Sequence, residues 1–362
     1  MPGTKDAPWL LNPGPCNVSD EVRAAINTPD ICHRENDYLE VQTEVRDLLM
    51  DAYDCDPSVW TSAMITGSGT AALEMAISSC VSATGAMLVV ENGVYGERIR
   101  AMCDAHDITT YSVTGPWTER PDLHAIEETI LANPDIEVVA MVHHETTTGL
   151  INPVDDVATI ARRHGKRIVL DTISGLGGEA LDLANVDIAV CTANKLAQGL
   201  PGVSFCLIRR DFAEDVKGYP SRTLYLNLAN YIAKQEVGGT PFTPAVQITY
   251  AFRQALRELR DEGLSNRVGR MAAASETLRA GFRRLGLKSY IDERYHSNTI
   301  TTLLLPEGVT YPVLHDRMRE RGYVIYAGQG DLSKRVFRIA NMGLLPQAAI
   351  EGVITALEES IR

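Results

Sequence analysis

The 362-residue chain lacks the features of disulfide-rich, metal-binding and membrane proteins. Its seven cysteines are odd in number and widely spaced, and no two of them form a CxxC pair. This pattern argues against a disulfide framework or a zinc site, and it favours reduced thiols in a cytoplasmic protein. No window approaches 18 consecutive apolar residues, and the first residues contain no apolar signal region. We therefore expect neither a membrane span nor secretion.

Basic residues are also scarce. The chain has 34 lysines and arginines against 47 aspartates and glutamates, which gives a formal net charge of -13 at pH 7. Such an acidic balance disfavours nucleic acids and anionic membranes as main partners, although a local basic spot can still bind a small anion. The hydrophobic fraction of 45% is that of an ordinary globular protein with a sizeable core.

Strand-like apolar runs alternate with helical patterns between residues 62 and 205. This alternation predicts an α/β fold with a mostly parallel sheet and helices on both faces. Helices are expected at 97–106 and at 121–131, the second opened by its proline. Residues 209–233 are expected to be irregular, and the mixed pattern towards the carboxyl terminus predicts a smaller α+β domain. The resulting division is an N-terminal arm (1–15), a large domain (16–250) and a small domain (251–362).

Lys195 follows an apolar strand (188–192) and precedes a turn rich in glycine and proline. A lysine beside a buried strand can lose hydration, which lowers its pKa and frees the amine as a nucleophile. Taken alone, Lys195 is better explained as a solvated surface residue. Asp171, which ends the strand 167–171, changes this balance. A lysine for a Schiff base and an aspartate for a pyridinium nitrogen are the two parts that a pyridoxal 5′-phosphate (PLP) site needs.

Several other polar stretches fall at the carboxyl ends of predicted strands. The GSGT turn (67–70) opens a helix, so its backbone N–H groups and hydroxyls can cradle a phosphate, although a plain capped turn explains it equally. Tyr95, in NGVYG (92–96), can stack on a flat ring or simply pack in its turn. The three threonines of HHETTTG (143–149) can tune a ring by hydrogen bonding.

Two arginines have the chemistry to bind a substrate anion. Arg34 lies beside a histidine in a loop that is otherwise explained as solvated. Arg338 sits within an apolar strand, where a charge is costly unless it is paired with a neighbouring acid or with a ligand. A guanidinium fork suits the oxygens of a carboxylate or a phosphonate.

Taken together, these motifs resemble the class V aminotransferases of PLP fold type I, over nearly the whole chain. Within that class the pattern is most similar to the 2-aminoethylphosphonate–pyruvate transaminase family. The matching stretches are NPGP (12–15), GSGT (67–70), NGVYG (92–96), HHETTTG (143–149), TANK (192–195) and FRIANMG (337–343).

The resemblance implies a fold, a cofactor and a set of roles. The fold would be a PLP-dependent transferase of type I, with a seven-stranded, mostly parallel sheet. Lys195 would carry PLP as a Schiff base and move the substrate proton, and Asp171 would keep the ring nitrogen protonated. Thr243 would bind the cofactor across a site shared by a homodimer. The substrate would be bound by Arg338, Arg34 and Asn12. The other residues that would bind the cofactor are Ser68, Gly69, Thr70, Tyr95 and Thr146.

The resemblance implies small-molecule substrates, namely an aminophosphonate with a keto acid or amino acid, and no metal. The His-Arg-Glu stretch at 33–35 differs from many catabolic relatives and favours the biosynthetic direction. The alternatives are an alanine–glyoxylate or serine–glyoxylate aminotransferase, a PLP-dependent aminophosphonate lyase and a non-catalytic protein of the same fold.

Overall fold

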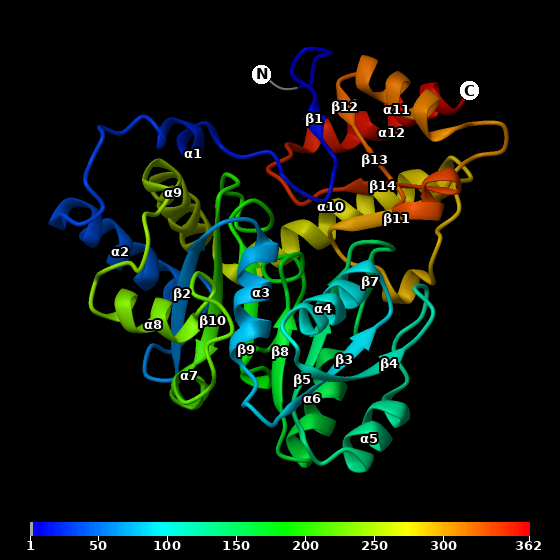
Figure 1. Ribbon diagram of the computed structural model, residues 1–362. Coiled ribbons are helices and arrows are strands. Elements are labelled where there is room, and N and C mark those ends of the chain that lie inside the picture. Colours follow the sequence, from blue (N-terminus) through cyan, green and yellow to red (C-terminus); the bar gives the residue numbers. More distant parts are fainter. Residues whose placement is uncertain (1–2) are drawn as a thin grey trace.

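The computed structural model describes residues 3–362, so the first two residues of the predicted arm lie outside it. Figure 1 shows a central sheet covered by helices, with a smaller group of strands and helices at the top of the view. The first strand, β1 (Trp9–Leu10), lies in that smaller group and pairs in parallel with β12 (Tyr323–Val324). The N-terminal segment therefore joins the C-terminal part of the fold.

The central sheet has seven strands in the order β2-β10-β9-β8-β5-β3-β4. Only β10 runs antiparallel to its neighbours, so the prediction of a mostly parallel seven-stranded sheet is confirmed. These strands are nearly continuous apolar runs, as expected where helices cover both faces of a sheet. Their bounds are β2 (Trp60–Thr66), β3 (Ala86–Glu91), β4 (Thr109–Thr114), β5 (Ile136–Val142), β8 (Arg167–Asp171), β9 (Ile188–Thr192) and β10 (Val203–Arg209).

Each face of the sheet packs against its own layer of helices. One core contains residues of α2 (Asn36–Ala52), α5 (Leu123–Ala132), α6 (Val154–Arg163) and α9 (Val246–Glu262). The opposite core contains residues of α3 (Gly69–Ser79), α4 (Val94–Ala105), α7 (Arg210–Lys217) and α8 (Leu228–Glu236). Helix α6 shows why these segments are helical. Its apolar residues recur at helical spacing, with acidic residues in the first turn and basic residues in the last.

Three local predictions were wrong. Residues 209–233 are not irregular throughout, because Phe212 and Ile232 anchor the short helices α7 and α8 on the sheet, and only residues 218–227 between them lack regular structure. Helix α5 begins at Leu123 with Asp122 as its N-cap, rather than at the proline before it. Helix α4 begins at Val94, three residues earlier than predicted, so Tyr95 lies in its first turn.

The C-terminal part has its own three-stranded sheet in the order β11-β14-β13 and its own apolar core. Within residues 3–362, no helix is long and apolar enough to cross a membrane. The elements not yet given are α1 (Asp20–Ala24), β6 (His144–Glu145), β7 (Leu150–Ile151), α10 (Leu264–Arg284), β11 (Ile300–Leu304), α11 (Tyr311–Glu320), β13 (Tyr326–Ala327), β14 (Val336–Ala340) and α12 (Gln347–Ile361).

Candidate functional site

A cavity of about 220 Å³ lies at the carboxyl edge of the central sheet. Parallel strands end at one edge, so loops that are distant in sequence meet there. The cavity is also lined by Pro13 and Gly14 of the N-terminal segment and by Tyr326 and Gln329 of the C-terminal part. The predicted residues that line it are Ser68, Gly69, Thr70, Tyr95, Asp171 and Lys195.

Asp171 is the last residue of β8 and is 4% exposed. Its Oδ1 accepts a hydrogen bond of 3.0 Å from the Ile173 N–H. Burial raises the pKa of this carboxyl group, whereas the Ile173 N–H and the positive charges of Lys195 and Arg98 lower it. A carboxylate in this setting is stabilised by a cationic partner at its free edge.

Lys195 lies three residues beyond the end of β9. Its Nζ donates to the Ser174 hydroxyl at 3.0 Å and lies 5.9 Å from the centre of the Tyr95 ring. Burial lowers the pKa of this amine, and the Tyr95 hydroxyl and Asp171 partly restore it. Gly14 approaches so closely that an added Cβ would lie 3.0 Å from the Lys195 Cγ. The surroundings of Lys195 therefore lower the pKa of its amine, whereas its own stretch of sequence was better explained by a solvated residue.

The GSGT turn forms the start of α3. Gly69 is the first helical residue, and Ser68, the N-cap, makes no side-chain capping bond of its own. The first N–H groups of a helix have no partner within it, so they are available to an anion. A Cβ at Gly69 would lie 2.9 Å from the Ile173 Cδ1, so glycine lets Ile173, two residues beyond β8, pack closely against the turn.

Arg98 is a cavity residue that the sequence analysis missed. Its guanidinium carbon lies 4.6 Å from the centre of the Tyr95 ring, and its Nη1 donates to the Thr70 hydroxyl at 3.4 Å. Tyr95 and Arg98 are three residues apart on α4, and that spacing on a helix would have indicated the contact. The arginine thus joins the aromatic ring to the GSGT turn.

His144 also lines the cavity, whereas Thr146 does not. The His144 Nδ1 is 2.9 Å from the Ser174 carbonyl oxygen, and its buried Nε2 has no hydrogen-bond partner among the described residues. The buried Thr146 hydroxyl is also unpaired within residues 3–362, and its carbonyl accepts from the Arg338 Nη1 at 2.7 Å. His144 has no separate signal in the sequence, because it stands in the same HHETTTG stretch as the three threonines.

Arg338 is completely buried in β14. Its Nε and Nη2 donate to the Ala327 carbonyl at 2.9 and 2.7 Å, in addition to the bond to Thr146. Its guanidinium carbon lies 5.1 Å from the centre of the ring of Tyr326, which lines the cavity. The five guanidinium N–H groups exceed these three bonds by two, one on each terminal nitrogen.

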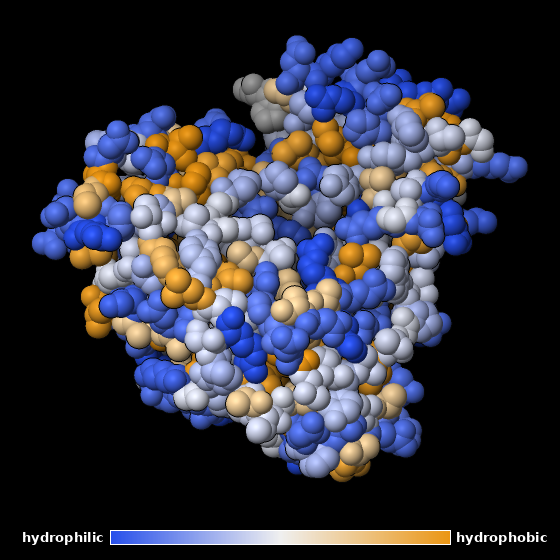
Figure 2. All heavy atoms as spheres, in the orientation of Figure 1, coloured by the Kyte–Doolittle hydropathy of each residue, from blue (hydrophilic) through white to orange (hydrophobic). Residues whose placement is uncertain are grey.

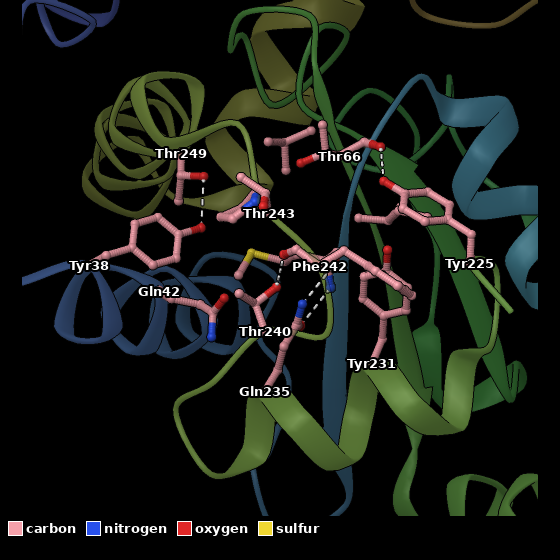
Figure 3. Close-up of a pocket in the computed structure, with 14 residues that line it drawn as sticks. Tyr38, Gln42, Thr66, Tyr225, Tyr231, Gln235, Thr240, Phe242, Thr243 and Thr249 are labelled. Atoms are coloured by element: carbon pink, nitrogen blue, oxygen red, sulfur yellow. Dashed lines mark hydrogen bonds between the residues drawn. The ribbon is translucent and has the colours of Figure 1, made fainter. Parts of the chain in front are cut away.

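The other predicted residues lie outside this cavity. The Asn12 amide donates to the Pro15 carbonyl at 2.9 Å, and its buried Oδ1 is unpaired in the described chain. Arg34 is exposed just before α2. Thr243 lines a separate small cavity with Tyr38, Thr66 and Tyr225, as Figure 3 shows. Within one chain, neither Arg34 nor Thr243 reaches the Lys195 cavity.

Comparison with known families shows which family the chain belongs to. The profile described as "Aminotransferase class-V" matches residues 37–328, which is most of the chain. The chain belongs to the class V aminotransferase family.

Curated relatives of this aminotransferase cover nearly its full length. A protein of Vibrio vulnificus strain CMCP6 named 2-aminoethylphosphonate–pyruvate transaminase is 36% identical over 359 residues, 97% of each chain. One of the same name from Vibrio cholerae strain O395 is 35% identical over 365 residues, 99% of this chain and 98% of the relative.

Solved structures share the fold. The pyridoxamine–pyruvate aminotransferase of Mesorhizobium loti superposes with a TM-score of 0.89 at 25% identity, covering 99% of this chain and 94% of its own. The alanine–glyoxylate aminotransferase of Nostoc sp. gives a TM-score of 0.88 at 27% identity, covering 98% and 95%. The predicted PLP fold type I is therefore confirmed.

Class V aminotransferases depend on PLP, and the cavity of this chain fits that cofactor. The open start of α3 suits the phosphate of PLP, and the buried Asp171 carboxylate suits its ring nitrogen. The Lys195 amine, whose pKa is lowered by burial, suits its aldehyde. The buried Nε2 of His144 in the cavity wall also lacks a polar partner within residues 3–362. By contrast, residues 3–362 contain no group of three or more His, Cys, Asp or Glu placed to hold a metal ion.

Proposed function

We propose that this aminotransferase interconverts 2-aminoethylphosphonate and pyruvate with phosphonoacetaldehyde and L-alanine. The observation that carries the proposal is the identity of 35–36% with transaminases of that name over nearly the whole chain. The cavity supports it, because Lys195, Asp171 and Tyr95 surround one space beside the buried Arg338.

Lys195 and Asp171 carry the chemical step. Bound PLP supplies a ring that withdraws electrons from the carbon bearing the substrate amino group. The Lys195 Nζ would hold the cofactor through its aldehyde carbon. Once the substrate amine has replaced it there, the freed Nζ would take the proton from the substrate carbon and pass it to the former aldehyde carbon, and burial favours this role by lowering the pKa of the amine. Asp171 would face the ring nitrogen and keep it protonated, and Tyr95 would pack against the ring, since both side chains line the cavity.

Arg338 anchors the substrate anion. Three of its N–H groups are fixed by the carbonyls of Ala327 and Thr146, so the guanidinium cannot rotate freely. The two remaining N–H groups, one on each terminal nitrogen, suit the paired oxygens of a carboxylate or phosphonate. Its charge also lowers the pKa of Lys195, after the larger effect of burial.

Several remaining features belong to this proposal. We assign Thr243 to the cofactor phosphate of a partner subunit in a homodimer, and Arg34 and Asn12 to the substrate.

The Phe252, Leu256 and Leu259 side chains of α9 pack in the core of the large sheet. We retain the three-part division but place the start of the small domain after α9 rather than at residue 251. Seven free cysteines agree with a cytoplasmic enzyme.

The proposal is tested by supplying the purified, PLP-loaded enzyme with 2-aminoethylphosphonate and pyruvate and measuring L-alanine. We expect alanine in equal amounts to phosphonoacetaldehyde, and the reverse reaction from L-alanine shows which direction is faster. Alanine–glyoxylate exchange without phosphonate turnover would favour the glyoxylate alternative. Ammonia release without a keto acid would favour the lyase.

A matched variant shows that Lys195 carries the reaction. Lys195→Ala is expected to lose the visible absorbance band of the lysine-linked cofactor and to slow turnover by at least about 10²–10⁴-fold, the usual contribution of a proton-transferring side chain. Lys217, which pairs with Glu214 on the surface of α7, is the control, and Lys217→Ala should change neither quantity.

A further inference from the structure

Gln329 brings an amide from the C-terminal part of the fold into the wall of the Lys195 cavity. It stands two residues after β13 and lines the cavity together with Tyr326. Gln329 also precedes a short 3₁₀ helix (Gly330–Lys334), but its side chain makes no capping bond to that helix. The residue is half-buried, so its amide is available to a molecule that fills the cavity.

Gln329 joins the same two segments of the chain as Arg338. The Thr147 hydroxyl lies 3.2 Å from the Gln329 Oε1, so this side chain reaches from the C-terminal part to the HHETTTG stretch. Arg338 donates to the carbonyl of Thr146, one residue earlier, and to the carbonyl of Ala327, two residues before Gln329. The guanidinium and the amide are therefore held between the same pair of loops.

The contact with Thr147 determines which end of the Gln329 amide remains for a ligand. The Thr147 hydroxyl shares its one hydrogen between the Glu145 Oε1 at 2.5 Å and the Gln329 Oε1 at 3.2 Å. This is the one side-chain hydrogen bond of Gln329 within residues 3–362, and it uses the carbonyl oxygen. The two N–H groups of the amide nitrogen are left as donors at the cavity wall.

The two amino donors of the proposed reaction differ in what their anionic group needs. The carboxylate of L-alanine has two oxygens, which match the two remaining N–H groups of Arg338. A phosphonate has three oxygens, and the third needs a further donor when water is excluded. The phosphonate of 2-aminoethylphosphonate also stands one carbon further from the carbon that bears the amino group, so it extends further from Lys195.

We propose that the Gln329 amide nitrogen donates to the third phosphonate oxygen and thereby favours the phosphonate substrate over the carboxylate. The inference rests on the proposed function, because it names the residue by which the same site distinguishes its two amino donors. Arg338 binds either anion, whereas Gln329 contributes only where a third oxygen is present. Gln329 is therefore a specificity-determining residue of this cavity.

The two half-reactions of one enzyme supply the test. The PLP-loaded enzyme is mixed rapidly with 2-aminoethylphosphonate or with L-alanine, and decay of the visible band of the lysine-linked cofactor gives a second-order rate constant for each. Gln329→Met has a side chain of similar length without a donor. We expect it to lower the constant for 2-aminoethylphosphonate by about tenfold or more, as for one hydrogen bond to a charged group, and that for L-alanine by less than about twofold.

A second variant and a control separate the hydrogen bond from the shape of the cavity wall. Gln329→Glu replaces the amide nitrogen with a second oxygen, so it should slow the phosphonate half-reaction more than Gln329→Met does. Gln347→Met is the control, because Gln347 pairs with Glu351 at the exposed start of α12, and it should change neither half-reaction. Thermal melting and the absorbance band of each loaded variant check that it folds and holds the cofactor.

The outcomes distinguish the inference from the function beneath it. Equal losses with both substrates in the Gln329 variants, or no loss with either, would overturn the inference and leave the proposed function in place. A larger loss with L-alanine would overturn it as well, because the amide would then bind the carboxylate. If the wild type reacts with L-alanine but not with 2-aminoethylphosphonate, the proposed function itself fails.

Discussion

Two positively charged side chains, Lys195 and Arg98, lie near the Tyr95 ring and contact different parts of the cavity. The Lys195 Nζ lies on the reactive side at 5.9 Å, whereas Arg98 lies at 4.6 Å and donates to Thr70 in the GSGT turn. A phosphate is doubly charged near neutral pH, and the helix start contributes only part of the opposite charge. Arg98 supplies a full positive charge at that end of the cavity.

Replacing Arg98 should weaken cofactor binding more than it alters the fold. Arg98→Leu is expected to raise the dissociation constant of PLP by about 10–100-fold, the range of one to two charge-assisted hydrogen bonds. Fluorescence titration of the apoenzyme measures this. Arg100→Leu is the matched control, because Arg100 lies on the same helix but pairs with Asp104. Equal affinity in the wild type and Arg98→Leu would contradict the assignment.

Asp171 should be needed in its ionised form. Burial raises its pKa, so the carboxylate is stable only beside positive charge, which the protonated ring nitrogen provides. Asp171→Asn keeps the shape but removes the charge, and we expect about 10²-fold or greater loss of turnover, as for other removed electrostatic contacts. Rapid-mixing measurement of the first half-reaction with 2-aminoethylphosphonate checks this. Retention of more than half of the wild-type rate would show that the charge is dispensable.

Several of these residues could be predicted because of where each stands in the chain. Gly69, Tyr95 and Lys195 follow buried strands and Asp171 ends one, and parallel strands end at the same edge. Arg98 was missed because the helix was predicted to begin after Tyr95, which hid the three-residue spacing. Thr243 and Arg34 lie outside the cavity of their own chain, and no pattern within one chain can place a residue relative to a partner subunit.

At the scale of elements, Glu145 holds the start of α4 against β6. It is fully buried, and its Oε2 accepts from the Tyr95 N–H at 3.1 Å while its Oε1 accepts from the Thr147 N–H at 3.1 Å. The Tyr95 N–H belongs to the first turn of α4, where donors have no partner within the helix. A single carboxyl group therefore orients both the stacking residue and the threonine run.

The pKa of Glu145 gives this contact a pH dependence. Burial raises the pKa from 4.5 to about 7, against the hydrogen bonds from Thr147 and Tyr95, and the charge of Asp171 raises it further. Because the folded pKa exceeds the unfolded one, the folded state binds more protons in this window. The contribution of Glu145 is therefore fully present below about pH 4.5 and declines as the pH rises through 7.

We therefore expect Glu145→Gln to remove a defined part of the pH dependence of stability. The apo wild type should lose roughly 2–3 kcal/mol of unfolding free energy between pH 5 and 8 relative to Glu145→Gln, from a shift of this size. Urea unfolding at both pH values measures the difference. Gln can still accept from the Tyr95 N–H, so α4 should stay in place. Parallel pH profiles for the two proteins would refute the raised pKa.

The direction of β10 could be inferred from the length of the connection that precedes it. Residues 193–202 between β9 and β10 hold no helix, and β10 pairs antiparallel with both β9 and β2. A parallel neighbour needs a crossover of a dozen or more residues, whereas an antiparallel one needs only a short turn. The connection length therefore already implied the antiparallel strand, although the alternation of elements predicted only the sheet as a whole.

At the scale of the whole molecule, apolar side chains remain exposed near the loop that carries Thr243. Leu224 and Val237 are 82% and 80% exposed, and Tyr225 lines the Thr243 cavity. Figure 2 shows further apolar side chains over the region of α1 and α9 at the upper left. Exposed apolar groups gathered on one face are typical of a protein–protein contact. This distribution supports the proposed homodimer.

Subunit complementation tests whether Thr243 serves the partner subunit. Lys195→Ala is inactive in our scheme, and Thr243→Val should need about tenfold more PLP because it loses one hydrogen bond to the phosphate. The two variants are co-expressed with different affinity tags, and the mixed dimer is purified on both tags. If Thr243 reaches across, one site of that dimer combines an intact Lys195 with the partner's intact Thr243. Its activity at limiting PLP should then approach half that of the wild-type dimer.

If Thr243 acts within its own chain, the only intact Lys195 shares its site with the valine. The mixed dimer would then show the weak PLP affinity of Thr243→Val, and the shared-site assignment would be wrong.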